Sequence, residues 1–212
     1  MKKIDSKLHW DQVYEKNETE KLGWFEESPD SSIQLINKCN FNNSSIILNV
    51  GAGATTLVDE LLKNGYKNII ATDLSSSSLN KLKKRLGEKR SSKVNWIIDD
   101  LTNSSELIKL SPIDLWHDRA VLHFFTEEKE QIAYFELLSK LVKVGGYVII
   151  AVFNLDGATK CSGLPVFRYS STMLEEKLGA NFKLIETFDY TYIMPSGDTR
   201  EFIYTLFKRS GC

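Results

Sequence analysis

Short apolar runs alternate with amphipathic stretches along most of the chain. Between the apolar runs, apolar residues recur at helical spacing around 57–62, 79–86 and 132–142. An alternation of strands and helices predicts a parallel sheet with helices on both faces. The apolar runs that we interpret as strands are 46–50, 68–72, 94–98, 113–117 and 147–153.

Polar residues and glycines indicate where the helices begin and end. Ser76 or Ser77 is expected to cap one helix, and Thr126 is expected to cap a later one. Gly145-Gly146 is expected to end that later helix. One side of it carries the apolar residues Ile132, Phe135, Leu138, Leu141 and Val142.

The C-terminal part has a different pattern. Thr172 and Glu175 fit a capping box for a short helix that ends at Gly179. The long, aromatic-rich runs 182–192 and 200–208 follow, with turn residues between them. We therefore expect an antiparallel hairpin at one edge of the sheet.

Charge and hydropathy exclude several classes of protein. The 212 residues include 27 basic and 28 acidic side chains, for a net charge of −1, which gives no electrostatic reason to expect nucleic-acid binding. No apolar run approaches the roughly 18 residues of a membrane span. The start, MKKIDSKLHWDQ, has no apolar secretory region. We expect a cytoplasmic protein, a monomer or weak homodimer, without nucleic-acid or membrane partners.

Length and cysteine content point to a single domain over residues 1–212. A chain of this length buries roughly 70% of its unfolded surface and needs no metal or disulfide to fold. Its cysteines are Cys39, Cys161 and Cys212, which show neither a CxxC pair nor zinc spacing. Neither a disulfide framework nor a metal site is expected.

The glycine-rich turn after the first predicted strand, Asn49-Val50-Gly51-Ala52-Gly53, is the strongest candidate for a ligand site. Glycines let the backbone turn sharply and approach a ligand closely. Asp73 ends the second strand, about 20 residues further on, where a carboxylate is able to accept both hydrogens of a ribose diol. The alternative for Asp73 is a turn or helix-cap residue.

Asp99-Asp100-Leu101 ends the third strand and is a candidate adenine site. One carboxylate would accept the amino hydrogens of the base and Leu101 would pack on the ring, although the sequence leaves open which aspartate points inward. A dinucleotide fingerprint needs a third glycine where Thr56 stands. The sequence therefore favours an adenosine cofactor without phosphates over NAD or FAD.

Together these segments resemble the class I S-adenosylmethionine-dependent methyltransferases. The resemblance is carried, in the order of the family's motifs, by Ile47–Gly53, Ile70–Ser75, Trp96–Leu101, Asp114–His123 and Leu141–Tyr147. It implies an α/β fold, a Rossmann-like doubly wound sheet of seven strands in the order 3-2-1-4-5-7-6 with strand 7 antiparallel. The expected parts are an N-terminal helical cap (1–45), a cofactor-binding core (46–153) and a substrate loop, helix and terminal hairpin (154–212).

The resemblance implies S-adenosyl-L-methionine as cofactor. Two positions depart from the family pattern, since Asn49 stands where an acidic residue is usual and Thr55 where a third glycine is common. His9–Tyr14 and Gly23–Pro29 resemble an aromatic cap able to face the cofactor's sulfonium, with simple core packing as the alternative. The implied cofactor residues are Trp10, Tyr14, Trp24, Asn49, Gly51, Ala52, Gly53, Asp73, Leu74, Asp100, Leu101 and Asp118.

Candidates for contact with the methyl acceptor follow the fourth and fifth strands. Arg119 or Arg168 is a candidate partner for an anionic substrate. The segment 154–170 is long for a connection and is expected to be a substrate loop. For His123, a packed core histidine is an equal alternative. The catalytic candidates after the fourth strand are His117, Asp118, Arg119 and His123.

The near-neutral charge, aromatic cap and lack of an obvious strong base favour a small-molecule acceptor, in particular a thiol. One alternative is a protein-lysine N-methyltransferase, because Trp10, Tyr14 and Trp24–Ser28 resemble the N-terminal pattern of those enzymes. Against it, His117-Asp118-Arg119-Ala120 lacks their Asp-Lys-Gly motif. A non-catalytic cofactor-binding module is the other alternative.

Overall fold

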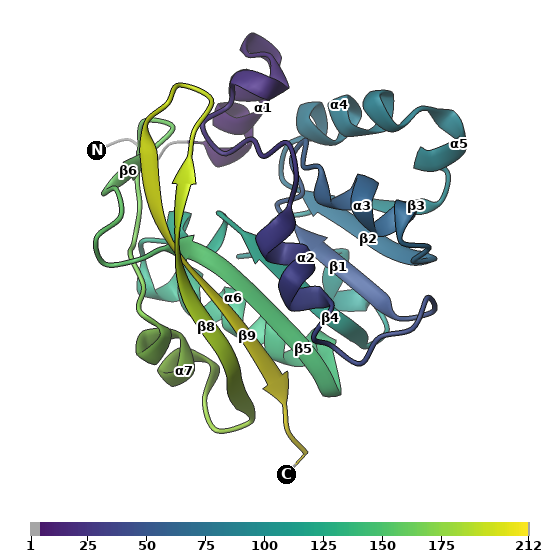
Figure 1. The fold of residues 1–212 in the computed structure, drawn as a ribbon, viewed down its shortest axis with the longest axis vertical. Helices are drawn as coiled ribbons and strands as arrows, with labels where there is room; N and C mark the ends of the chain where they lie inside the picture. Colours follow the sequence, from purple (N-terminus) through teal and green to yellow (C-terminus); the bar gives the residue numbers. More distant parts are fainter. Residues whose placement is uncertain (1–4, 212) are drawn as a thin grey trace.

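Seven of the strands form one twisted sheet, in the order β3-β2-β1-β4-β5-β9-β8, in a computed structural model that describes residues 5–211 (Figure 1). β9 pairs antiparallel with both β5 and β8, whereas the other pairs are parallel. β9 is the seventh strand of this sheet along the chain, which confirms the predicted order. The strands are β1 (Ile46–Val50), β2 (Asn68–Asp73), β3 (Val94–Ile98), β4 (Ile113–Arg119), β5 (Val142–Phe153), β8 (Phe182–Ile193) and β9 (Thr199–Arg209).

Helices cover both faces of the sheet. Among the described residues, no helix combines the length and apolar character that crossing a membrane requires. Helices α2 (Asp30–Ile36), α3 (Leu57–Lys63) and α4 (Ser76–Leu86) lie on one face, and α6 (Glu128–Leu141) and α7 (Ser171–Leu178) lie on the other. The remaining helical segments are α1 (Ser6–Lys16), α5 (Glu88–Ser91), η1 (Thr19–Lys21), η2 (Leu107–Lys109) and η3 (Leu122–Phe124).

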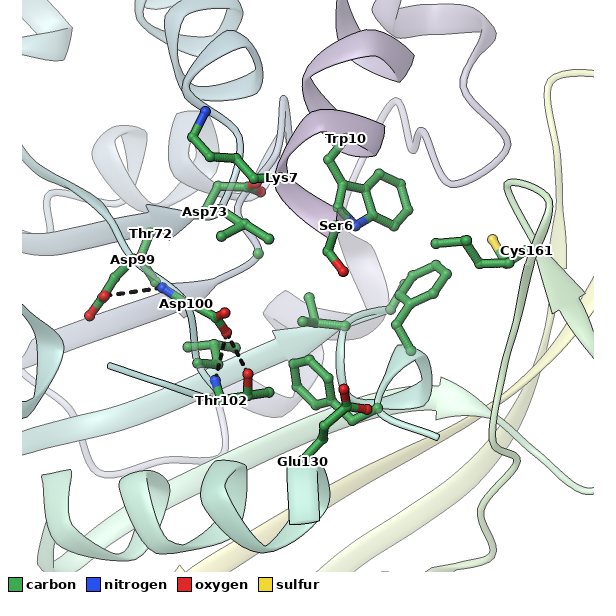
Figure 2. Close-up of a pocket in the computed structure, with 18 of the residues that line it drawn as sticks. Ser6, Lys7, Trp10, Thr72, Asp73, Asp99, Asp100, Thr102, Glu130 and Cys161 are labelled. Carbon is green, nitrogen blue, oxygen red and sulfur yellow. Dashed lines mark hydrogen bonds between the residues drawn. The ribbon is translucent and has the colours of Figure 1, made fainter. Parts of the chain in front are cut away.

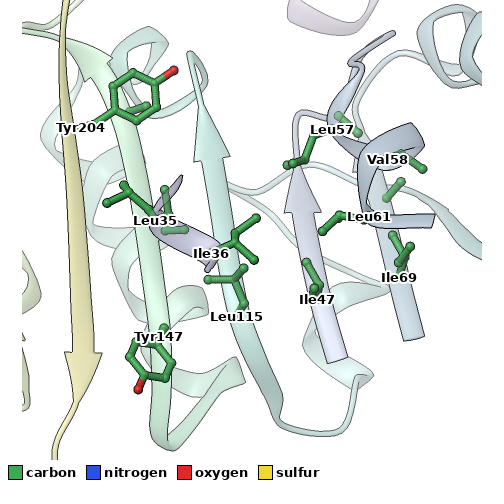
Figure 3. Close-up of a cluster of buried hydrophobic side chains, with 14 of the residues drawn as sticks. Leu35, Ile36, Ile47, Leu57, Val58, Leu61, Ile69, Leu115, Tyr147 and Tyr204 are labelled. Carbon is green, nitrogen blue, oxygen red and sulfur yellow. The ribbon is translucent and has the colours of Figure 1, made fainter. Parts of the chain in front are cut away.

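The core between α2, α3 and the sheet explains why β1 reads as a continuous apolar run (Figure 3). Leu35 from α2 and Leu61 from α3 pack in the same cluster as Ile47 of β1 and Leu115 of β4, and all four are fully buried. Leu48 of β1 points into the opposite cluster, beneath α6. A strand buried on both faces is apolar at nearly every position, with the buried Asn49 as the exception in β1, and each buried leucine or isoleucine contributes about 2 kcal/mol.

Several predicted helix caps are displaced by one or two residues. The helix expected to start at Ser76 or Ser77 is capped by Ser75, whose hydroxyl accepts a hydrogen bond from Ser78 N. The cap of α6 is Glu127 rather than Thr126, because Glu127 and Glu130 form a capping box. Ser170, not Thr172, caps α7, although this helix ends before Gly179 as predicted.

The boundary between α6 and β5 also differs from the prediction. The helix ends at Leu141, and Gly145-Gly146 lies inside β5 instead of stopping the helix. A bulge interrupts the pairing of β4 with β5 here, and Gly145 (φ +80°) occupies it. Ile132 is 48% exposed because the buried side of α6 runs through residues such as Tyr134 and Leu138.

The N-terminal helix α1 stands over the carboxyl ends of the strands, beside α4 (Figure 1). Asp11 accepts a hydrogen bond from Ser75 Oγ at 2.7 Å, at the start of α4. Lys81 of α4 donates to the carbonyl of Asn17 at 2.6 Å, just beyond α1. These bonds fix α1 above the turn that follows β2.

A short hairpin forms within the segment predicted as a substrate loop. Its strands are β6 (Lys160–Cys161) and β7 (Leu164–Pro165), joined by Ser162 and Gly163. Both linking residues have positive φ, +50° and +78°, as in a two-residue type I′ turn. A turn of this kind holds its flanking residues in one fixed register. Of the cysteines, Cys39 and Cys161 are free, and Cys212 lies outside the described residues.

Candidate functional site

A cavity of about 520 Å³ opens at the carboxyl ends of β1, β2, β3 and β4, beneath α1 (Figure 2). This is where open α/β sheets bind their ligands, and the volume is within the range of small-molecule sites. Figure 2 shows carboxylates on one side of the cavity, including Asp73 and Asp100, and Trp10 and Cys161 on the other. The cavity therefore has a polar half and an apolar half.

The glycine turn after β1 is held by Asp73. Gly51 and Gly53 have φ of +53° and +52°, which non-glycine residues adopt only with strain. Gly53 N donates to Asp73 Oδ2 at 2.7 Å, and Ser75 N donates to Oδ1 at 2.8 Å. Burial raises the pKa of Asp73 to about 6, against the effect of these two bonds. Each carboxylate oxygen has a further lone pair available for a ribose hydroxyl.

The two aspartates after β3 have different environments. Asp99 is 8% exposed and accepts hydrogen bonds from the backbone N–H groups of Ser105, Glu106 and Leu107, which shape the turn before η2. Although burial acts in the opposite direction, these bonds hold the pKa of Asp99 below its usual value. Both aspartates line the cavity, but Asp100 uses only Oδ1, which accepts from the N–H and hydroxyl of Thr102, whereas the bonds to Asp99 occupy both of its oxygens. Asp100 is therefore the better candidate for a contact with adenine.

We expect this difference to separate the two alanine variants. Asp99→Ala leaves several buried N–H groups without a partner and should lower the free energy of unfolding by about 3 kcal/mol. Asp100→Ala should leave stability nearly unchanged and weaken binding of S-adenosylhomocysteine about 10- to 100-fold, as expected for a lost charge-assisted hydrogen bond. Urea unfolding and calorimetric titration measure the two quantities. Equal effects of both variants on binding would contradict the assignment.

Aromatic side chains form the apolar half of the cavity. The rings of Trp10 and Phe124 lie 4.9 Å apart and those of Trp10 and Trp24 lie 5.6 Å apart, both edge to face. Trp24 Nε1 donates to Tyr14 Oη at 3.2 Å. Burial raises the pKa of Tyr14 well above its usual value, so its hydroxyl stays neutral. Such walls suit an apolar or cationic group.

Arg119 lines the cavity, but its guanidinium is bound to the N-terminal arm, the residues 5–29 that precede α2. Its Nη1 donates to the carbonyl of Trp24 at 2.8 Å, its Nε donates to Tyr204 Oη at 3.0 Å, and its Nη2 lies 2.9 Å from Glu26 Oε1. The guanidinium also stacks on the ring of Tyr192, 5.0 Å from its centroid. Because these partners occupy Arg119, we infer that it positions Trp24.

The backbone carbonyls of the two residues after Trp24 also accept hydrogen bonds from side chains outside this arm. Tyr192 Oη donates to the carbonyl of Phe25, and Thr56 Oγ1 donates to that of Glu26 at 3.1 Å. Arg168, the other arginine considered for an anionic substrate, donates to the carbonyl of Leu155 at 2.5 Å. Both arginines therefore stabilise the fold, and neither presents an unpaired guanidinium to the cavity.

Asn49 and His117 lie behind the glycine turn, next to a smaller cavity of about 40 Å³. His117 Nδ1 lies 3.0 Å from Asn49 Oδ1, and its Nε2 lies 2.9 Å from Ser32 Oγ of α2. Burial, with a smaller effect from Arg119, lowers the pKa of His117 to about 3. A neutral histidine in this chain of hydrogen bonds links the turn to α2.

Asp118 and His123 line neither cavity. Asp118 is fully buried and accepts hydrogen bonds from Val121 N, Leu122 N and Tyr134 Oη, which support the turn after β4. Burial raises its pKa to about 7 despite these bonds. His123 is also fully buried, and burial lowers its pKa to about 3. The structure therefore does not place these two catalytic candidates where they would touch a ligand.

Most of the other sequence-predicted residues meet at the larger cavity. Ala52 and Asn49 line the smaller one, and Gly53 supports the turn through Asp73. Sequence reasoning missed Lys7, Phe124, Phe125 and Glu130, for which no motif gives a signal. The predicted residues that line the larger cavity are Trp10, Tyr14, Trp24, Gly51, Asp73, Leu74, Asp100, Leu101 and Arg119.

Ionisable side chains make the larger cavity acidic. Both of its basic residues are already paired, Lys7 with Asp11 at 2.6 Å and Arg119 with Glu26 at 2.9 Å. Carboxylates without such a partner raise the local concentration of cations and favour a positively charged ligand. The acidic residues among those described that line the cavity are Asp5, Asp73, Asp99, Asp100 and Glu130.

Comparisons with known proteins find similarity to methyltransferases. The family described as "Methyltransferase domain" matches residues 48–148, which include the glycine turn and the strands that carry Asp73 and Asp100. The mouse protein named EEF1A lysine methyltransferase 2 is 28% identical over 189 residues, which cover 82% of this chain and 74% of the relative.

Two solved structures have the same fold. An S-adenosylmethionine-dependent methyltransferase from Anabaena variabilis aligns with a TM-score of 0.78 and 14% identity, covering 98% of this chain and 96% of that one. The N-methyltransferase NodS from Bradyrhizobium japonicum, solved with S-adenosyl-L-homocysteine, aligns with a TM-score of 0.69 and 15% identity, covering 96% and 100%. At these identities the likeness concerns the fold alone.

Proposed function

We propose that this chain, which is a class I S-adenosylmethionine-dependent methyltransferase, transfers the methyl group to the side-chain amine of a lysine in a protein. The observation that carries this proposal is the alignment of 82% of the chain with the mouse EEF1A lysine methyltransferase 2. The sequence favoured a small thiol as acceptor, with protein lysine as the alternative. The relative supports that alternative over the thiol.

The residues present fit the cofactor. Gly51 and Gly53 form a tight turn in which an added Cβ would clash with Val121 or Tyr14. Asp73, Asp100 and Leu101 line the cavity beside this turn, which supports the roles expected for them toward a ribose and an adenine. S-adenosylmethionine supplies an activated methyl group on a positively charged sulfur. Carboxylates along the cavity and the rings of Trp10 and Trp24 favour that positive charge.

The same features support an amine acceptor. A lysine side chain has an apolar stem and a cationic tip, which match the aromatic walls and the carboxylates of the cavity. The amine must lose a proton before its nitrogen forms the new bond to carbon as the sulfur–carbon bond breaks. Neither His117 nor His123 lines the larger cavity, so we expect the proton to leave to water. In-line placement of the acceptor is then the main contribution of the protein.

The test is transfer of a radiolabelled methyl group from S-adenosylmethionine. We expect label on protein, recovered as methyllysine after hydrolysis, with purified elongation factor 1A as the first substrate to try. A whole-cell protein extract and a panel of small thiols are tested in parallel. Asp73→Ala serves as the inactive control, because it removes the carboxylate placed for the ribose. Label confined to small thiols would contradict the proposal.

A further inference from the structure

The apolar half of the cavity has a wall from a segment remote in sequence. Trp10, Trp24 and Phe124 form one part of this half, and Cys161 and Leu164 of the β6–β7 hairpin form the rest. Figure 2 shows Cys161 on the side where Trp10 lies, opposite the carboxylates Asp73, Asp99 and Asp100. A nucleoside bound by Asp73 and Asp100 would leave this half open to a second ligand.

The hairpin geometry explains why these two residues face the cavity together. Cys161 and Leu164 are directly paired across the hairpin, and paired residues of two strands point to the same face. Lys160 pairs with Pro165, and this next pair points to the other face, where both residues are exposed. The turn at Ser162 and Gly163 fixes which pair is turned inward.

The base of the hairpin is tied to the opposite wall. Phe167 N donates to the carbonyl of His123 at 2.7 Å, immediately before Phe124. Val166 N donates to the carbonyl of Thr159 at 3.1 Å and closes the hairpin. The spacing between Cys161 and Phe124 is therefore set by backbone hydrogen bonds. The pKa of Cys161 is raised to about 11, chiefly by burial, so its thiol is neutral and forms a wall without acting as a nucleophile.

We propose that the acceptor's side chain binds in the apolar half of the cavity, between the aromatic residues of the N-terminal arm and η3 and the inward face of the β6–β7 hairpin. Cys161 and Leu164 are then specificity-determining residues, because they limit the width of an unbranched alkyl chain beside the transferred methyl group. The identity of that chain as lysine rests on the proposed function above. The location of the binding site does not.

Cofactor analogues in which nitrogen replaces the sulfur test the location without a known substrate. One analogue carries a methyl group on that nitrogen, and the other carries an n-butyl chain that would extend into the apolar half. Burying the three additional methylene groups should make the butyl analogue bind the unaltered protein about 50-fold more tightly. Cys161→Phe fills this half, and we expect it to abolish the gain while it changes the affinity for the methyl analogue less than about 3-fold.

A second pair of variants changes the hairpin without adding volume to the cavity. Gly163→Val places a β-branched residue at φ +78°, and Gly145→Val places one at φ +80° in the bulge of β5. No atom lies within 4 Å of the Cβ position at either glycine, so both variants carry similar backbone strain. We call the ratio of the affinities for the butyl and the methyl analogue the butyl preference. We expect only Gly163→Val to reduce it, by about 10-fold, because this variant alone disturbs the turn that directs Cys161 inward.

The outcomes separate the binding site from the acceptor's identity. An undiminished butyl preference in properly folded Cys161→Phe and Gly163→Val would overturn the location, and so would an equal loss in Gly145→Val. A 2-(methylamino)ethyl analogue then addresses the proposed function. It has the length of the butyl chain but carries an amine close to the transferred carbon, where the lysine nitrogen would lie, so a lysine site should accept it at least as well as the butyl one. If the butyl analogue binds as expected and the 2-(methylamino)ethyl analogue is rejected, the location stands and the lysine proposal fails.

Discussion

Gly51→Ala is expected to weaken binding of S-adenosylhomocysteine by about 100-fold or more. A Cβ at this position would overlap Val121 Cγ2, and the backbone φ of +53° is unfavourable for any side chain. The left-handed conformation alone costs about 1–2 kcal/mol, and overpacking adds about 1–3 kcal/mol. Relief requires a shift of the turn that faces the ligand, so calorimetric titration should show the loss directly.

A suppressor variant distinguishes steric overlap from general damage. Val121→Ala removes Cγ2 and leaves Cβ, which would lie 3.3 Å from the new methyl group. The double variant Gly51→Ala/Val121→Ala should therefore recover most of the affinity and retain the backbone strain, a deficit of about 10-fold. Gly87→Ala is the matched control, because Gly87 has φ +73° and nothing within 4 Å of its Cβ position. Normal binding by Gly51→Ala would show that the turn does not approach the ligand.

The sequence predicted the sheet well because the parallel strands are buried on both faces. Ile47 and Leu48 of β1 point into opposite clusters, so every position of β1 except Asn49 is apolar and the strand is easy to locate. Helix caps were harder. Four consecutive serines, Ser75–Ser78, are all good cap residues, and only the direction of the chain leaving β2 selects Ser75.

Acidic residues at strand ends could be located from the sequence, but their roles could not be separated. Asp73, Asp99, Asp100 and Asp118 all lie at or just beyond the ends of predicted strands. Asp73, Asp99 and Asp100 all line the cavity, but Asp99 uses both of its oxygens to organise the turn before η2, and Asp118 is buried beneath the turn after β4. Which of these carboxylates is free to bind a ligand depends on the local turn geometry, and no sequence motif predicts that geometry.

The apolar half of the cavity is formed only by tertiary packing. Phe124 comes from a 3-10 helix, and Cys161 comes from a hairpin whose strands have two residues each. Both elements are too short to show a periodic pattern of hydrophobic residues. The sequence indicated that the segment 154–170 would contribute to a substrate site because of its length. Within that segment Cys161 is an expected packing or substrate-wall residue, but the sequence could not indicate that Leu164 would be turned inward beside it.

Arg119→Met is expected to cause the largest loss of stability among these variants. The arginine pairs with Glu26, and the two side chains are only 11% and 12% exposed. Removing the cation leaves a buried carboxylate without its partner, which costs about 3–5 kcal/mol. The hydrogen bond that holds the carbonyl of Trp24 is lost as well, so we expect methyl transfer to fall together with the free energy of urea unfolding.

The pH dependence of this loss identifies Glu26 as its cause. Burial already raises the pKa of Glu26 although Arg119 opposes it, so removing Arg119 should raise that pKa further. A carboxyl whose folded-state pKa lies above its unfolded value destabilises the fold as pH rises through the folded pKa and does so least below the unfolded one. The difference between Arg119→Met and the unaltered protein should therefore be large at pH 8 and smaller toward pH 5. Arg119→Met/Glu26→Gln should remove most of this pH dependence, and a deficit that is independent of pH in both variants would show that lost packing, not the unpaired charge, is responsible.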